Sequence, residues 1–248
     1  MKNGKKIIAV LPAYNAVKTL TQTLGDIPRT WVDDIILVDD ASTDGTPELA
    51  RSLGLTTIVH PKNRGYGGNQ KTCYDAALEH GADIVIMVHP DHQYDPTLIP
   101  TLIGPIARGE ADAVFGSRML RRGEALKGGM PYWKYVANIT LTLIENAVLG
   151  LRLSEYHSGF RAYRSSALRT LRYHDNSDNF VFDTEIIVQC KVQGLTIKEV
   201  PIPTRYFKDA SSVGIKSSIV YGMSILNVMV QFMLHRLRLR SYLKFELA

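Results

Sequence analysis

The sequence predicts an α/β fold, in which helices cover both faces of a mostly parallel sheet and an amphipathic helix follows at the C-terminal end. Short β-branched apolar runs alternate with helical patterns along the chain, which is typical of such a sheet. Polar clusters follow several of these runs, at the strand ends where parallel sheets bind ligands. The 248 residues, 45% hydrophobic and 21% charged, have the composition of a globular protein with a full core.

Each apolar run is short and rich in β-branched residues, so we expect it to form a strand buried on both faces. The expected strands are Ile7–Leu11, Ile35–Val38, Thr56–Val59, Ile84–Val88, Ala113–Phe115, Phe160–Tyr163 and Thr196–Val200. Helical patterns occupy the intervals near 17–25, 45–53, 68–80, 97–108, 132–149 and 183–193. Asp95 followed by Pro96 is typical of a helix start, and loops are expected at 117–131 and 152–159.

We divide the chain into a main domain at 1–210 and a C-terminal extension at 211–248. The extension contains a predicted helix at 216–235, which is apolar except for a narrow stripe of polar residues spaced three or four apart. The stripe consists of Ser217, Tyr221, Ser224, Asn227, Gln231 and His235. We expect this helix to be too short and too polar to span a bilayer. Because Arg236, Arg238 and Arg240 follow it, it resembles an interfacial membrane anchor. The alternative is a helix that packs on the body or on a second subunit of a homo-oligomer.

The formal net charge of +5 is unevenly distributed, since Lys244 adds to the C-terminal arginines. This favours an anionic partner surface, either lipid headgroups or phosphate. No nucleic acid is expected as partner, because the chain has no basic stripe interleaved with aromatic residues. Cys73 and Cys190 lie in predicted helices and are expected to be free thiols. The first apolar run is too short for a signal peptide, so we expect a cytoplasmic protein, peripheral on the inner face of the plasma membrane.

Two adjacent carboxylates, Asp39 and Asp40, follow the second predicted strand. Side-chain oxygens in the segment 39–46 can cap a helix or form Asx-turns, which explains several of its polar residues. Two like charges at a strand end are unfavourable unless a ligand or a cation neutralises them. The segment therefore indicates either a helix start or a ligand-binding loop.

The segment after the fourth strand offers ligands for a divalent cation. Such a cation, bound by one or two carboxylates and by phosphate oxygens, neutralises the charge of a diphosphate leaving group. Asp91 is the candidate ligand, with His89 and Gln93 on the same side of the turn. The alternative, an aspartate that only caps the following helix, fits Asp95 better than Asp91.

Glycines lie between Arg64 and Asn69, directly before a predicted helix. A glycine-rich loop at a helix start can bind phosphate, although the spacing here is not that of a P-loop. Close packing of the helix explains the glycines equally well.

Several short motifs along the chain occur in a familiar order and spacing. They are Pro12-Ala-Tyr-Asn15, Val38-Asp39-Asp40-Ala-Ser-Thr-Asp44, Asn63-Arg-Gly65, His89-Pro-Asp91-His-Gln93, Gly116-Ser-Arg118, Ser158-Gly-Phe160-Arg161 and Phe182-Asp183-Thr-Glu185. In these motifs the chain, from residue 7 to about residue 208, resembles family 2 glycosyltransferases, and among them the dolichyl- or polyprenyl-phosphate mannose and glucose synthases. The resemblance implies a Rossmann-like GT-A fold, inversion at the anomeric carbon, a UDP- or GDP-sugar donor and a Mg²⁺ or Mn²⁺ cofactor.

The resemblance also implies roles for individual residues. Nucleotide contacts are expected from Pro12, Ala13, Tyr14, Asn15, Asp39, Asp40, Asn69 and Asp91. The metal is expected at Asp91, Gln93 and His89. Acceptor or phosphate contacts are expected from Arg118, Arg161, Arg205, Ser158 and Gly159. The expected catalytic residues are Asp91, Arg118, Asp183 and Glu185, the last two as bases. Two positions depart from the family pattern: His89 replaces the first acid of an Asp-x-Asp motif, and Glu155 stands where an aspartate often precedes Ser-Gly-Phe.

Two acceptor classes and one non-enzymatic function remain open at this stage. A lipid phosphate acceptor is already anionic and needs arginines rather than a base. A hydroxyl acceptor on a saccharide or lipid needs Asp183 or Glu185 to take its proton. A non-catalytic, membrane-associated nucleotide-sugar-binding protein would agree with the imidazole at His89. A nucleotidyltransferase is not expected, because no basic glycine-rich loop follows the first strand.

Overall fold

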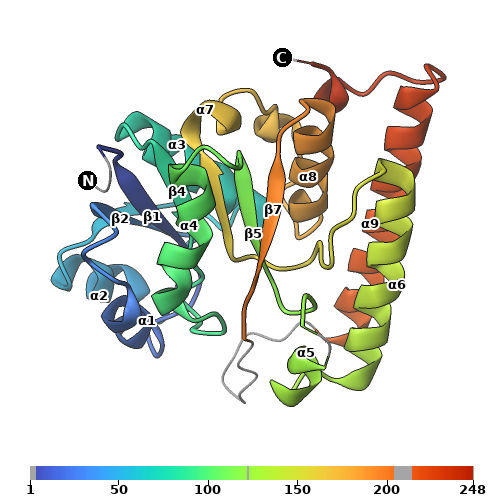
Figure 1. The fold of residues 1–248 in the computed structure, drawn as a ribbon. Helices are drawn as coiled ribbons and strands as arrows, with labels where there is room; N and C mark the ends of the chain where they lie inside the picture. The colour runs from blue at the N-terminus through green and yellow to red at the C-terminus, as the bar shows by residue number, and fades with distance from the viewer. Residues whose placement is uncertain (1–3, 122, 204–213, 248) are drawn as a thin grey trace.

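The computed structural model describes residues 4–121, 123–203 and 214–247, and it has helices on both faces of one sheet (Figure 1). The strand order is β3-β2-β1-β4-β6-β5-β7. The strands are β1 (Ile7–Ala13), β2 (Asp34–Asp39), β3 (Thr56–Val59), β4 (Ile84–Met87), β5 (Ala113–Ser117), β6 (Arg161–Arg164) and β7 (Ile197–Pro201). All pairs are parallel except those of β6 with β4 and β5. The predicted α/β class and all the predicted strands are confirmed.

The side chains of β1 explain why the sheet needs a helical layer on each face. Ile8 and Val10 belong to one apolar cluster, whereas Ile7, Ala9 and Leu11 belong to the other, because successive side chains of a strand point to opposite faces. All five are fully buried. The continuous apolar run is therefore the pattern of a central strand.

The helices divide between these two clusters. Helices α1 (Leu20–Asp26), α2 (Thr46–Ser52) and α4 (Ile99–Ala107) cover one face, and α3 (Gly65–Glu79) and α8 (Phe182–Val192) cover the other. As predicted, the Asp95 side chain caps the 3₁₀ turn η1 (Pro96–Leu98) that leads into α4. Two short helices, α5 (Glu124–Lys127) and α7 (Ser165–Leu168), and the 3₁₀ turn η2 (Tyr173–Asp175) were not expected from the sequence. Cys73 and Cys190 are buried free thiols, as predicted.

Helices α6 (Tyr132–Leu149) and α9 (Ile215–Arg236) lie side by side at one margin of the molecule (Figure 1). Helix α9 packs on the body, since Ile225, Val228 and Met229 belong to the same apolar cluster as α3 and α8. The following turn, η3 (Leu243–Phe245), buries Phe245 beside the last turns of α9. One face of α9 therefore packs on the body, as one of the two predicted alternatives has it.

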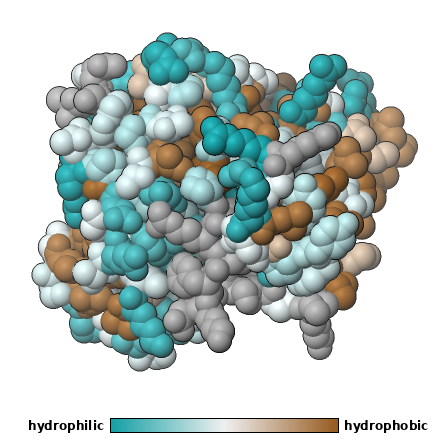
Figure 2. Space-filling model, turned by 60° about the horizontal axis from the view of Figure 1, so that its bottom comes forward, coloured by the Kyte–Doolittle hydropathy of each residue, from teal (hydrophilic) through white to brown (hydrophobic). Residues whose placement is uncertain are grey.

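The opposite faces of α6 and α9 expose apolar side chains. These are Tyr132, Trp133, Val136, Ile139 and Leu143 of α6, and Ile219, Val220, Met223, Val230 and Met233 of α9. We call this surface the α6–α9 apolar face, and apolar atoms are visible along that margin in Figure 2. Within the described residues, Ser217–Arg236 is the segment whose length and mean hydropathy of 1.5 would allow it to cross a membrane. The expectation that this helix is too short and too polar for a bilayer is thereby corrected.

Candidate active site

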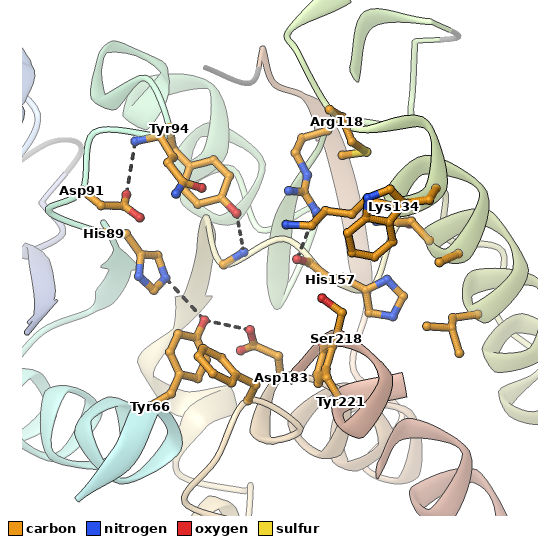
Figure 3. A pocket seen from close by; sticks show the side chains of 18 residues that line it. Tyr66, His89, Asp91, Tyr94, Arg118, Lys134, His157, Asp183, Ser218 and Tyr221 are labelled. Carbon is orange, nitrogen blue, oxygen red and sulfur yellow. Dashed lines mark hydrogen bonds between the residues drawn. The ribbon is translucent and has the colours of Figure 1, made fainter. Parts of the chain in front are cut away.

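A cavity of about 260 Å³ opens beside the carboxyl end of β4 (Figure 3). Its lining comes from α3, from the segments after β4 and β5, from α6 and the loop after it, and from the starts of α8 and α9. The lining includes six predicted site residues, namely His89, Asp91, Gln93, Arg118, Gly159 and Asp183. The structure thus brings residues that are far apart in the sequence into one cavity.

Asp91 and His89 form one wall of this cavity (Figure 3). The carboxylate Oδ1 of Asp91 accepts a hydrogen bond of 3.1 Å from the backbone N–H of Gln93. The described residues contain no cluster of three or more His, Cys, Asp or Glu side chains suited to a metal. One carboxylate, an amide and an imidazole still fit a cation that takes its other ligands from phosphate oxygens and water, as Mg²⁺ does.

His89 has a fixed position because aromatic and glycine residues surround it. Its ring is parallel to that of Tyr66, with 5.7 Å between the ring centroids. A Cβ atom on Gly159 would lie 2.4 Å from His89 Nε2, so only glycine fits at position 159. The Gly159 N–H in turn donates to the hydroxyl of Tyr94 at 3.1 Å. The Ser-Gly-Phe motif therefore closes the cavity directly behind the imidazole.

Asp183 begins the opposite side of the cavity, in the first turn of α8. Its carboxylate accepts from the Tyr66 hydroxyl at 2.8 Å and from Gln70 Nε2 at 3.2 Å. Burial, followed by the charge of Asp183, raises the pKa of Tyr66, so this phenol remains a donor. Because Tyr66 also lies 3.5 Å from His89 Nε2, it connects the two sides of the cavity.

Arg161 lies beneath the cavity and does not line it. Its side chain is 2% exposed and lies 3.3 Å from Asp183 Oδ1. Its guanidinium donates to the backbone carbonyls of Tyr156, Ser158 and Asp183. The structure thus places this predicted acceptor contact outside the cavity lining, where the arginine positions Asp183 and the Ser-Gly-Phe segment.

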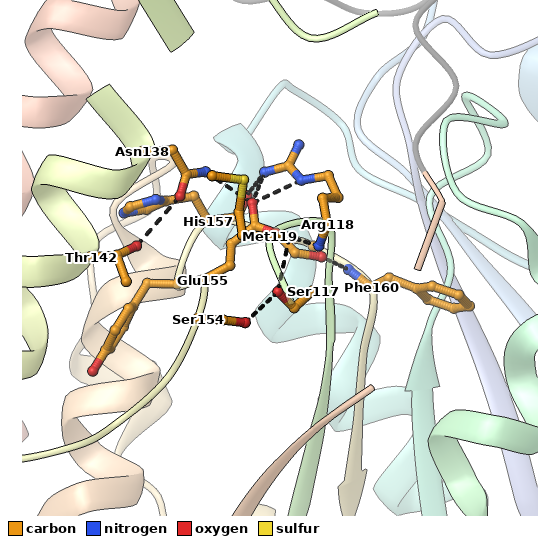
Figure 4. Close-up of polar contacts among 12 residues, drawn as sticks. Ser117, Arg118, Met119, Asn138, Thr142, Ser154, Glu155, His157 and Phe160 are labelled. Atoms are coloured by element: carbon orange, nitrogen blue, oxygen red, sulfur yellow. Dashed lines mark hydrogen bonds and ion pairs between the residues drawn. The ribbon is translucent and has the colours of Figure 1, made fainter. Parts of the chain in front are cut away.

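Arg118 reaches the cavity while paired with a buried carboxylate (Figure 4). Its Nε donates to Glu155 Oε1 at 2.8 Å, and its backbone N–H donates to Glu155 Oε2 at 2.7 Å. Burial alone would raise the pKa of Glu155, but the charge and hydrogen bonds of Arg118 outweigh it and hold that pKa below its usual value. Asn138 of α6 also donates to Glu155, at 2.9 Å. The departure from aspartate at position 155 thus supplies a longer side chain that anchors Arg118.

Two basic residues that the sequence analysis missed, Lys134 and His157, line the wall opposite Asp91 (Figure 3). Burial and the nearby charge of Arg118 lower the pKa of Lys134. His157 Nε2 lies 3.0 Å from the fully buried Glu145 Oε2 of α6. Neither belongs to a motif, although His157 directly precedes Ser-Gly-Phe and could have been singled out on that ground.

Apart from Asp91, which lines the cavity, and Asn69 of α3, the predicted nucleotide contacts lie at the ends of β1 and β2, outside the cavity lining. Asn15 has a positive φ of 52° and accepts through Oδ1 from the Thr43 N–H at 3.0 Å, which joins the two loops. Asp39 is fully buried, and its Oδ1 has no hydrogen-bond partner among the described residues. Pro12 and Ala13 end β1, and the side chain of Tyr14 is 57% exposed. These residues meet as one group beside the first two strands.

Asp40 and Asn69 have structural partners that account for their side chains. Asp40 accepts from His60 Nδ1 at 2.8 Å and from the N–H groups of Arg64 and Gly65. Asn69 Nδ2 donates to the carbonyls of Ala13 and Val38. Both residues, which the sequence analysis predicts as nucleotide contacts, fix the ends of β1, β2 and α3 in this structure.

The glycine-rich segment is the first turn of α3, which begins at Gly65 and not at 68 as predicted. A Cβ atom on Gly67 would lie 2.4 Å from the carbonyl of Ser177. The N–H of Gly67 donates to the carbonyl of Asp178 at 2.9 Å. Close packing against the segment before α8, and not phosphate binding, therefore explains these glycines.

Glu185, which the sequence analysis predicts as a base, is not among the residues that line the cavity. Its carboxylate accepts from the N–H and the hydroxyl of Ser177, and Lys244 Nζ lies 2.6 Å from it. Ser158 is also buried, and its hydroxyl accepts from the Phe160 N–H at 3.3 Å. Arg205, a predicted phosphate contact, lies outside the described residues.

The family model described as glycosyl transferase family 2 matches residues 8–172 of the chain. The chain belongs to glycosyltransferase family 2. This assignment agrees with the motifs that carry the sequence resemblance, and it makes the protein an enzyme instead of a non-catalytic binding protein.

Relatives and solved structures agree with this family 2 assignment. An uncharacterised protein of Methanocaldococcus jannaschii is 33% identical over 224 residues, 90% of each chain. The UDP-N-acetylglucosamine–dolichyl-phosphate N-acetylglucosaminyltransferase of Methanococcus voltae is 30% identical over 238 residues, 89% of this chain and 93% of that protein. The crystal structure of glucosyl-3-phosphoglycerate synthase from Mycobacterium tuberculosis with Mn²⁺, UDP and glucosyl-3-phosphoglycerate superposes with a TM-score of 0.68 at 20% identity, covering 95% of this chain and 81% of that one. The predicted GT-A fold is thus confirmed.

Proposed function

We propose that this family 2 glycosyltransferase moves a sugar from a UDP- or GDP-sugar to a polyprenyl phosphate, with inversion at the anomeric carbon. The observation that carries the proposal is a single cavity in which Asp91 faces Arg118 and Lys134 (Figure 3), with Gln93 also in its lining. Such an arrangement suits a donor diphosphate on one wall and an acceptor phosphate on the other. The name of the Methanococcus voltae relative, with its dolichyl-phosphate acceptor, supports the acceptor class.

The donor nucleotide is assigned to the group of residues at the ends of β1 and β2. Buried polar atoms in proteins are nearly always hydrogen-bonded, so the unpartnered Oδ1 of Asp39 calls for a donor. An N–H of the base or a ribose hydroxyl supplies one. Because Asp39 is closed off from solvent, the loops that contain Asn15 and Ala41 must part slightly as the nucleotide enters. The diphosphate then extends toward Asp91.

A divalent ion held by Asp91, with Gln93 and His89 beside it, would neutralise the charge on the departing diphosphate. The Mn²⁺ and UDP named in the complex of the mycobacterial synthase support a divalent cation as cofactor. Tyr66 and Gly159 hold the His89 ring in position whether or not the ion is bound. Mn²⁺ suits an imidazole ligand better than Mg²⁺ does.

The acceptor phosphate is assigned to Arg118 and Lys134. One of its oxygens attacks the anomeric carbon while the bond from that carbon to the donor diphosphate breaks. No proton has to be removed, because the phosphate is already anionic at neutral pH.

A second candidate function is transfer of the sugar to a hydroxyl, and the position of Asp183 favours it. Asp183 of α8 lines the cavity, and a hydrogen bond from Tyr66 holds its carboxylate in place, so it could take the proton of the hydroxyl.

The α6–α9 apolar face is assigned to a membrane surface. Trp133 and Tyr221 line the cavity from the same two helices that expose this face, so a lipid lying against it could bring its phosphate into the cavity. Arg236, Arg238 and Arg240 follow α9 and suit anionic headgroups. The proposal therefore describes a cytoplasmic enzyme that is peripheral on the membrane.

The test is transfer from labelled UDP- and GDP-sugars to polyprenyl phosphate in the presence of Mn²⁺. We expect Asp91→Asn to lower kcat/KM by about 10²-fold or more, in the range seen when a stabilising group for transition-state charge is lost. Asp95→Asn is the matched control, because this neighbouring carboxylate caps η1 and should affect stability only. Normal turnover by Asp91→Asn would contradict the proposal.

The acceptor class is decided by Asp183→Asn. This variant should keep most transfer to a phosphate and lose transfer to a hydroxyl, which needs a base. Retained transfer of sugar to a saccharide or lipid hydroxyl by Asp183→Asn would exclude Asp183 as that base.

A further inference from the structure

The buried pair of His157 and Glu145 stands out among the cavity residues because no sequence motif requires it. His157 lies in the loop between α6 and β6, on the wall opposite Asp91 (Figure 3). Its side chain is 7% exposed, and its Nε2 lies 3.0 Å from Glu145 Oε2. Glu145 is fully buried in α6, and the hydroxyl of Thr184 donates to its other oxygen at 3.2 Å.

The charges around this pair indicate which group neutralises Glu145. From β5 and the loop before β6, Arg118 is paired with Glu155, and Arg118 also donates to the carbonyl of His157. From α8, Asp183 is paired with Arg161. From α9, the Tyr221 ring lies 5.9 Å from the His157 ring. Burial raises the pKa of the Tyr221 phenol, so this phenol stays neutral. From the loop itself, the Tyr156 ring lies 6.5 Å away, and burial likewise raises its pKa.

Within the described part of the chain, the basic side chain that lies against Glu145 is therefore the imidazole of His157. A carboxylate in a protein interior needs a hydrogen-bond donor or a cation beside it, and the ring of His157 is the group placed to supply one. A charged imidazole carries an N–H on both nitrogens. Nε2 faces Glu145, whereas Nδ1 makes no hydrogen bond to any described residue, although the ring lines the cavity.

We propose that His157, whose Nε2 lies against Glu145, recognises the phosphate of the acceptor through its Nδ1–H. The inference rests on the proposed function, because it names a residue for the acceptor side of the same cavity. An imidazole N–H on this wall would donate to a phosphate oxygen and would add to the charges of Lys134 and Arg118. Phosphate on a lipid and free phosphate share this chemistry, so the test must separate them.

The decisive variant is the double substitution His157→Gln with Glu145→Gln. It replaces a charged pair with two neutral, hydrogen-bonding side chains of related size, so no uncompensated charge is left in the interior. We expect the KM for polyprenyl phosphate to rise about tenfold or more, while the KM for the nucleotide sugar changes less than twofold. His174→Gln is the matched control, because His174 pairs with Asp75 on the surface outside the cavity.

A second measurement does not depend on turnover. The ring resonances of His157 in the full-length protein are followed by NMR during titration with citronellyl phosphate, inorganic phosphate and citronellol. We expect citronellyl phosphate to shift them. If inorganic phosphate also shifts these resonances, the anion alone is sufficient for binding. If inorganic phosphate does not shift them, the lipid chain is needed as well. Both results agree with recognition of the phosphate.

Two outcomes would overturn the inference. One is an unchanged acceptor KM in the double variant, and the other is an equal ring shift with citronellol, which has no phosphate. Failure of the proposed function has a different signature: the wild-type enzyme would transfer no sugar to polyprenyl phosphate from any donor, whatever the His157 resonances do.

Discussion

Gly159 illustrates how tightly single residues are constrained in this cavity. We expect Gly159→Ala to push the His89 ring from its place against Tyr66, because the new methyl group would lie 2.4 Å from His89 Nε2. A displacement of about 1 Å at a reacting centre can lower activity about 10²-fold, and overpacking costs about 1–3 kcal/mol of stability. Steady-state kinetics and urea unfolding measure the two effects. Gly25→Ala in α1 is the control, since no atom lies within 4 Å of its added methyl group.

Lys134 should give the acceptor step a pH dependence. Its pKa is lowered by burial and by Arg118, so with rising pH its positive charge is lost earlier than that of an ordinary lysine. If this charge holds the acceptor phosphate, the KM for polyprenyl phosphate rises on the alkaline side, while the KM for the donor does not. Lys134→Arg should move the rise to higher pH, because arginine stays charged. The same alkaline limb in both proteins would contradict this role.

At the level of residues, the sequence predicts those cavity-lining residues that directly follow a strand. Asp91 and Arg118 directly follow strands that are evident from their apolar runs, so their convergence follows from the topology of a parallel sheet. Lys134 and His157 reach the cavity only because α6 packs beside α9 and the chain then returns to β6, which no local pattern shows. Asp40 and Glu185 belong to matching motifs, but their partners come from distant segments, and only the structure reveals that these partners already satisfy them.

Helix α8 and the C-terminal turn η3 are joined by Glu185 and Lys244. We expect Glu185→Gln to lower the free energy of unfolding by about 1–3 kcal/mol, because Lys244 and the N–H of Ser177 lose a charged acceptor in a mostly buried place. Catalysis should change little, since Glu185 lies outside the cavity. Denaturant unfolding and hydrogen exchange of residues 243–247 test the anchor. A large drop in kcat with unchanged stability would restore Glu185 as a base.

At the level of elements, segments with a clear helical period or a β-branched run were easier to predict than very short helices. The helix expected at 132–149 and the strand expected at 56–59 have the predicted bounds. Helices α5 and α7 have only four residues each, too few to show a helical period. The start of α3 was predicted three residues late because glycine is a poor helix former, and contacts with the segment before α8 override that preference here.

The molecule as a whole presents one apolar margin to its surroundings, the α6–α9 apolar face. We expect Val220→Glu with Met223→Glu to reduce binding to vesicles that contain anionic lipid by about tenfold or more, since two side chains that are each 62% exposed would no longer enter the lipid. Co-sedimentation measures the change. Leu53→Glu is the control, because this leucine is 39% exposed at the end of α2, on a different element. Equal vesicle binding by all three proteins would argue against this docking surface.

The contact between His89 and Gly159 has a consequence for how such enzymes diverge. The imidazole fills the space that a side chain at position 159 would need, so a larger residue there displaces the histidine ring. A lineage that exchanges His89 for a smaller acid would first acquire a void beside Tyr66, and position 159 would then accept a methyl group without this displacement. The order of the two replacements therefore matters: a larger residue at 159 is less costly after the loss of the imidazole than before it.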